Sequence, residues 1–92
     1  MFSEPRVNVI ESDEGFSVEV LGRTGLLYVE GDRKMRVDSE VLTRTRIAVI
    51  KGSINRWDVP FENETIDDDK REKIFDNIVR AFNFTETIID VW

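Results

Sequence analysis

The spacing of apolar residues changes once along this chain, near residue 66. Before that position, apolar and polar residues alternate in short runs, such as FSVEVL at residues 16–21. A period of two is typical of strands that bury one face. After it, the apolar residues recur at intervals that place them on one face of a helix. These residues are Ile74, Phe75, Ile78, Val79 and Phe82.

The first half of the chain predicts short strands separated by turns. Glycines mark the turns, as in GRTG at residues 22–25 and at Gly31, because glycine adopts backbone conformations that tight turns require. We expect strands at residues 7–10, 16–21, 26–30, 33–40 and 46–51. The last of these is almost continuously apolar, which favours a central position in the sheet.

The run DDDKREKIFDNIVRAF at residues 67–82 predicts the helix. Asp67 is suited to the N-cap position, and Asp68 and Asp69 favour the helix dipole in the first turn. Asn83 can end the helix in a left-handed conformation.

We expect a single α+β domain over residues 1–92. One amphipathic helix has to bury its apolar stripe, and the sheet is the only surface available to it. The expected sheet is twisted and antiparallel with about six strands, a five-strand meander followed by a last strand at residues 87–92 after the helix. The C-terminal amphipathic helix is expected to pack on one face of this sheet.

The chain has neither cysteine nor histidine. Disulfides and thiolate chemistry are therefore excluded, and the commonest general base and transition-metal ligand is missing, which disfavours an enzyme. No apolar run approaches the roughly 18–20 residues of a membrane span, and the first residues lack the pattern of a secretory signal. We expect a cytoplasmic protein without a membrane partner.

The net charge of −6 disfavours nucleic acid as a direct partner and favours a basic protein. The acidic run Asp67–Asp69 does not indicate a metal site, because neighbouring helical side chains point about 100° apart. No glycine-rich phosphate loop is present. We therefore expect neither a metal nor a cofactor.

Three carboxylates on two neighbouring predicted strands form a candidate cluster. Asp38 and Glu40 are two residues apart on one strand and share a face, and Glu30 ends the strand before it. The cluster could contact a partner, form ion pairs with nearby arginines, or carry acid–base chemistry. Catalysis is disfavoured because no nucleophile or glycine-rich pocket accompanies the carboxylates.

The segment SINRWDVP at residues 53–60 joins the last meander strand to the helix. Trp57 could fill the core at this joint or anchor a partner at the surface. Pro60 cannot donate to a strand ladder, so the segment is interpreted first as a structural joint. On this interpretation Arg56 and Asp58 face outward.

Three segments in order carry a resemblance to a known family. They are LLYVEGDRKMRVDSEVL, RIAVIKGSINRWDVP and the helical run DDDKREKIFDNIVRAF. Together they resemble the predicted immunity proteins of bacterial polymorphic toxin systems, immunity protein family seventy-four, over roughly residues 18–91. The most specific element runs from Trp57 to Pro60. The other elements are Tyr28 and Glu30, Asp38 to Glu40, Ser53-Ile54 and Asn77-Ile78.

The resemblance implies a non-enzymatic protein that binds and neutralises a cognate bacterial toxin in the cytoplasm. Nucleases with basic clefts are one class of toxin that an acidic inhibitor would suit. The alternatives are a small interaction module with no toxin partner, which could form a homodimer through an edge strand, and an enzyme that uses carboxylates. The residues expected to contact a partner are Tyr28, Glu30, Asp38, Glu40, Arg56 and Trp57.

Overall fold

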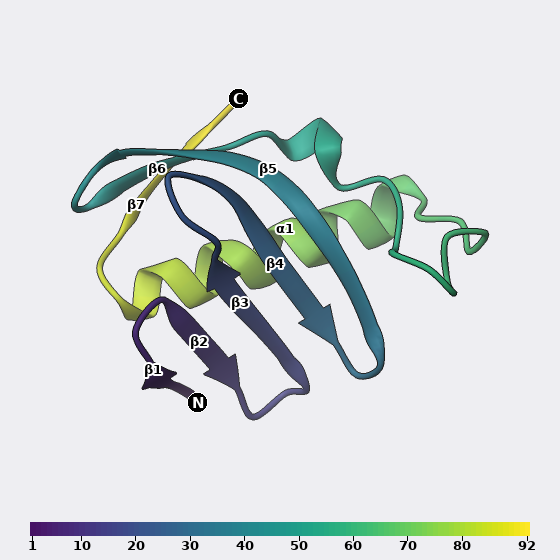
Figure 1. Ribbon diagram of the computed structural model, residues 1–92, viewed down its shortest axis with the longest axis horizontal. Coiled ribbons are helices and arrows are strands. Elements are labelled where there is room, and N and C mark those ends of the chain that lie inside the picture. Colours follow the sequence, from purple (N-terminus) through teal and green to yellow (C-terminus); the bar gives the residue numbers. More distant parts are fainter.

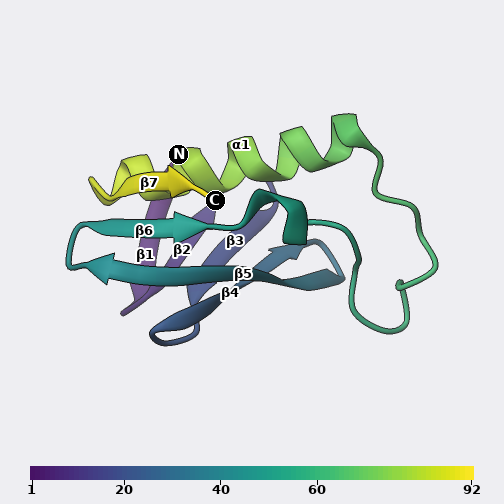
Figure 2. The same cartoon turned by 90° about the horizontal axis from the view of Figure 1, so that it is seen from above.

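A seven-stranded sheet and one long helix make up the protein, whose computed structural model describes residues 1–92. The sheet curls, and the helix lies on one side of it (Figures 1 and 2). The elements are β1 (Phe2–Arg6), β2 (Val9–Ser12), β3 (Phe16–Val20), β4 (Thr24–Glu30), β5 (Arg33–Thr43), β6 (Arg46–Val49), the 3-10 turn η1 (Lys51–Ser53), α1 (Asp68–Phe84) and β7 (Ile88–Val91). The predicted α+β class and the single helix on one face of the sheet are confirmed.

The strands lie side by side in chain order, from β1 at one edge to β7 at the other. Strands β1 to β6 are antiparallel, but β7 pairs with β6 in parallel. The sheet is thus mixed, because α1 carries the chain back along the sheet before β7 begins, as a crossover to a parallel strand requires. The predicted central position of β6 is wrong, since β6 lies next to the edge strand.

One strand more is present than the sequence predicted. Strand β1 contains Pro5 and the charged residues Glu4 and Arg6, a composition that disfavours strand prediction. It forms because an edge strand needs to hydrogen-bond on one side only. Its pairing with β2 is accordingly irregular, with a register shift between Ser3 and Arg6.

The core lies between the sheet and the helix. Alternate residues of each strand point inward, as Leu26 and Tyr28 of β4 and Met35 and Val37 of β5 do, and these four are fully buried. The register places Tyr28 opposite Met35. The helix contributes its own stripe to the same cluster, namely Ile74, Ile78, Ala81 and Phe82.

Both ends of α1 are capped by side chains, and the first matches the prediction. The carboxylate of Asp67 accepts a hydrogen bond from the backbone N–H of Lys70 at 2.8 Å. The other end differs, because the helix continues through Asn83 and is capped by Thr85, with the left-handed conformation at Glu86. The hydroxyl of Thr85 donates to the carbonyl of Phe82, an alternative way of satisfying a terminal carbonyl.

The segment between η1 and α1 is fastened to the core by three buried side chains, Ile54, Trp57 and Ile66. The backbone N–H of Asp58 also donates to the carbonyl of Lys34 at 2.7 Å, outside any regular ladder. The interpretation of SINRWDVP as a structural joint is therefore confirmed. Asp58 and Arg56 face outward, also as expected.

Replacing Asp67 with Ala should lower the free energy of unfolding by about 1 kcal/mol, because the N-cap hydrogen bond is lost. Asp69→Ala is the matched control, since Asp69 is exposed and lies in the first turn without accepting a capping bond. Asp69→Ala should lower the free energy of unfolding by less, because only a favourable interaction with the helix dipole is lost. Urea unfolding of the three proteins measures both effects. Equal losses in the two variants would contradict the capping role of Asp67.

Candidate functional site

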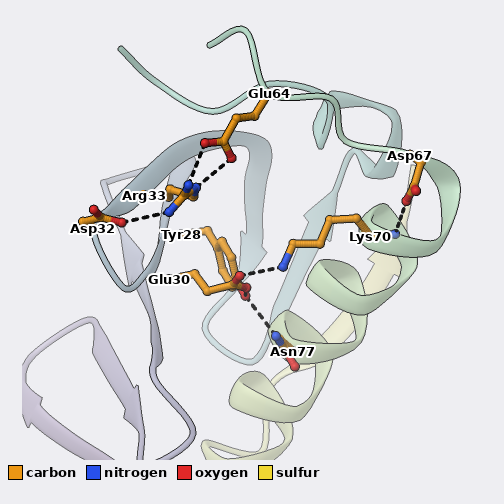
Figure 3. A network of polar contacts seen from close by, with 8 residues as sticks. All are labelled: Tyr28, Glu30, Asp32, Arg33, Glu64, Asp67, Lys70 and Asn77. Atoms are coloured by element: carbon orange, nitrogen blue, oxygen red, sulfur yellow. Dashed lines mark hydrogen bonds and ion pairs between the residues drawn. The ribbon is translucent and has the colours of Figure 1, made fainter. Parts of the chain in front are cut away.

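A polar network connects β4 to α1 around the side chain of Tyr28 (Figure 3). The Tyr28 hydroxyl donates to a carboxylate oxygen of Glu30 at 2.6 Å and accepts from the side-chain amide of Asn77 at 2.9 Å. Tyr28 and Glu30 share the inward face of β4 because they are two residues apart. Asn77 lies on the helix stripe that faces the sheet and is 3% exposed. The network thus joins sheet to helix within the core.

Lys70 extends this network toward the surface. Its ammonium lies 2.5 Å from the second carboxylate oxygen of Glu30 and 5.9 Å from the ring of Trp57. Burial on its own raises the pKa of Glu30. The hydrogen bonds from Lys70 and Tyr28, with the positive charges of Lys70 and Arg33, outweigh it and lower that pKa below its ordinary value. Glu30 is therefore a stable carboxylate.

The net shift of the Tyr28 pKa is in the opposite direction. Burial raises the pKa of the phenol, and the adjacent carboxylate of Glu30 raises it further. Tyr28 therefore keeps its proton and serves as a hydrogen-bond donor to Glu30. The ring of Tyr28 also stacks on two other rings. The distance between ring centroids is 5.9 Å to Phe16 and 6.2 Å to Trp57.

A second ion pair lies beside the first. Arg33 donates two hydrogen bonds to the carboxylate of Glu64, at 2.8 and 2.6 Å, in the bidentate arrangement that arginine favours. Its guanidinium also lies 4.2 Å from the centre of the Phe61 ring. The hydrogen bonds from Arg33 lower the pKa of Glu64. Together these contacts hold the loop before α1 against the start of β5.

Between the two ion pairs the surface is hollowed to a volume of about 390 Å³. Four of the charged groups around it are paired, Glu30 with Lys70 and Arg33 with Glu64. The pKa values of Glu30, Glu64 and Tyr28 are all displaced away from neutrality. None of the three changes protonation near pH 7. The lining residues are Glu30, Arg33, Trp57, Glu64, Thr65, Asp67 and Lys70.

The structure brings together three of the six residues predicted to contact a partner, namely Tyr28, Glu30 and Trp57. Two of them occupy the core instead of the surface, because Tyr28 is 0% and Trp57 3% exposed. Both rings are therefore buried in the free protein, and a partner contact by either of them stays a prediction. Their place in the core follows from the inward face of β4 and from the apolar contacts of the joint.

The other predicted residues lie apart from this network. Asp38 alternates with the buried Val37 and Ser39, so it faces the side of the sheet away from the helix, as does Glu40. The expected cluster of Glu30 with these two carboxylates does not form, because Glu30 points to the helix side. Arg56 is exposed on the joint. A partner contact at Glu30, Asp38, Glu40 or Arg56 stays a prediction.

Asn77 and Lys70 are network residues that were not predicted as site residues from the sequence. The signal for Asn77 is the clearer of the two. Its signal is visible in the run IFDNIVRAF, where Asn77 occupies a position on the apolar stripe between Ile74 and Ile78. A polar residue at such a position needs a buried hydrogen-bond partner. The pairing of Arg33 with Glu64, 31 residues apart, has no comparable local signal.

The three carboxylates of the acidic run at the start of α1 do not converge on one point. Asp67 caps the helix, Asp68 pairs with Arg71, and Asp69 is exposed. No group of three or more carboxylates is placed to hold a metal ion. No helix has the length and apolar character needed to cross a membrane.

The sheet, the single helix and the buried network between them define a small α+β protein. Residues 17–91 match the model of the family described as Immunity protein 74. The chain therefore belongs to the Immunity protein 74 family. Searches among curated proteins and among solved structures found no match.

Tyr28→Phe should lower the free energy of unfolding by about 1–3 kcal/mol, because the buried amide of Asn77 loses its acceptor and Glu30 loses a donor. The double variant Tyr28→Phe, Asn77→Leu should recover part of the loss, since it removes the unpaired amide. Urea unfolding of the single and double variants measures this. A single variant as stable as the natural protein would contradict the role of the hydroxyl.

Proposed function

We propose that this protein neutralises a cognate bacterial toxin by binding it in the cytoplasm, without catalysis. The observation that carries the proposal is the match of residues 17–91 to the Immunity protein 74 family. A neutraliser has to cover an active site or hold an inactive conformation. This requires a rigid scaffold and a complementary surface, and no catalytic group.

The polar network supports a binding role over a catalytic one. A general acid or base works best with a pKa near the working pH, whereas the pKa values of Glu30 and Tyr28 lie further from neutrality than usual. Their hydrogen bonds are used within the protein, between sheet and helix. Such a network makes the scaffold rigid and leaves recognition to the surface.

The charge of the surface favours a basic partner. The chain carries 19 acidic against 13 basic residues, and several exposed carboxylates form no ion pair within the protein. An acidic surface speeds association with a positively charged protein, which suits a toxin with a basic cleft, such as a nuclease. The exposed carboxylates without an ion pair are Glu4, Glu11, Asp58, Asp67, Asp69, Asp76 and Glu86.

Co-expression with the toxin encoded beside this protein's gene should restore growth of cells that the toxin alone kills. With purified proteins, the toxin's activity should fall in proportion to added protein and vanish near equal amounts. Ile78→Asp is the control, because a charge at this fully buried position unfolds the chain. Cells that die regardless of the protein would contradict the proposal. Inactivation by far less than one equivalent would indicate an enzyme.

A further inference from the structure

The sheet has two edges, and only one of them is protected against pairing with another strand. At the β1 edge, Pro5 lacks a backbone N–H, Glu4 and Arg6 carry charges, and the register with β2 is irregular. These are the devices by which proteins keep edge strands from recruiting other chains. The β1 edge is therefore closed to a further strand.

The β7 edge has fewer of these devices. Its four residues pair with β6 in unbroken parallel register and include neither proline nor a basic residue. Their one charged residue, Asp90, is paired with Arg46 of β6 at 2.9 Å. The N–H groups of Ile88 and Trp92 donate to the carbonyls of Thr45 and Val49, at 2.7 and 2.9 Å. Because N–H groups alternate in direction along a strand, those of Ile89 and Val91 point away from the sheet.

An apolar groove runs beside this free edge, between β7 and α1. It has a volume of about 420 Å³ and is lined by Phe75 and Val79 of the helix and by Ile88, Ile89 and Val91 of the strand region. Figure 2 shows β7 lying alongside the helix. Val91 is 58% exposed although it lines an apolar groove. Backbone groups and side chains are thus both available to one added strand.

The charge around the groove favours a basic occupant. Glu86 is the only ionisable residue that lines it. The ammonium of Lys51 lies 5.0 Å from the centre of the Phe75 ring, but its charge is paired with Glu72. Asp76 lies on the same side of the helix, one turn from Val79, and is exposed and unpaired. A second copy of this chain would bring a net charge of −6 to the same place and be repelled.

We propose that an extended segment of the toxin pairs with β7 and places its apolar side chains in the groove beside α1. This proposal rests on the function proposed above and names the contact surface for it. The segment carries apolar residues at alternate positions, as strand addition requires. It also carries a lysine or arginine that pairs with Glu86.

Val91→Pro tests the backbone contact, because the proline removes an N–H that points away from β6 and leaves the β6–β7 ladder intact. The probe is the toxin domain identified by the rescue experiment, carrying a substitution that abolishes its activity. By calorimetry, Val91→Pro should weaken binding by about tenfold or more. Glu86→Lys should also weaken it, whereas Glu4→Lys, the same charge change on the closed edge, should have a much smaller effect.

Amide hydrogen exchange on the natural protein gives a second measurement that needs no variant. Without the toxin domain, the amides of Ile89 and Val91 should exchange rapidly, and those of Ile88 and Trp92 slowly. With the toxin domain bound, Ile89 and Val91 should become protected, because their N–H groups enter a ladder.

The outcomes separate this proposal from the function on which it rests. If the natural protein binds the toxin domain but Val91→Pro binds equally well and Ile89 and Val91 stay unprotected, the docking surface is wrong and the function stands. If the natural protein forms no complex, both fail. If Val91→Pro converts a dimer to a monomer while toxin binding is unchanged, the edge belongs to a second copy and the proposal is overturned.

Discussion

The side chain of Tyr28 is the contact on which the arrangement of sheet, helix and joint depends. Its hydroxyl holds Asn77 of the helix and Glu30 of its own strand, and its ring packs between Phe16 and Trp57. One fully buried residue therefore contacts both main layers and the segment that links them. A buried network of this kind fixes one arrangement, because any shift leaves polar groups unpaired at a high cost.

The pairing of polar groups within the protein limits which groups can bind a partner. Glu30 and Lys70 satisfy each other, and Arg33 and Glu64 do the same, so the hollow between them has few groups free for a partner. Under the proposed function, recognition uses the surface, where unpaired carboxylates and the β7 edge remain. Membership of the Immunity protein 74 family supports this proposed binding role.

Local signals in the sequence predicted the helix well, because the Asp67 cap and the stripe through Ile74 and Ile78 are features of neighbouring residues. They did not predict the parallel pairing of β7, since pairing direction depends on where a helix returns the chain. The burial of Tyr28 could not be predicted from local signals either. The strand LLYVE has apolar residues on both faces, so the sequence does not say which face is inward.

Trp57 is 3% exposed at the joint, and we propose that it stabilises the fold without contacting the partner. Trp57→Phe separates the two roles when the free energy of unfolding and the affinity for the toxin are both measured on the variant. The free energy of unfolding should fall by about 1–3 kcal/mol, as for a buried large-to-smaller change, and the affinity for the toxin should not change. Unchanged stability with weakened toxin binding would contradict this proposal.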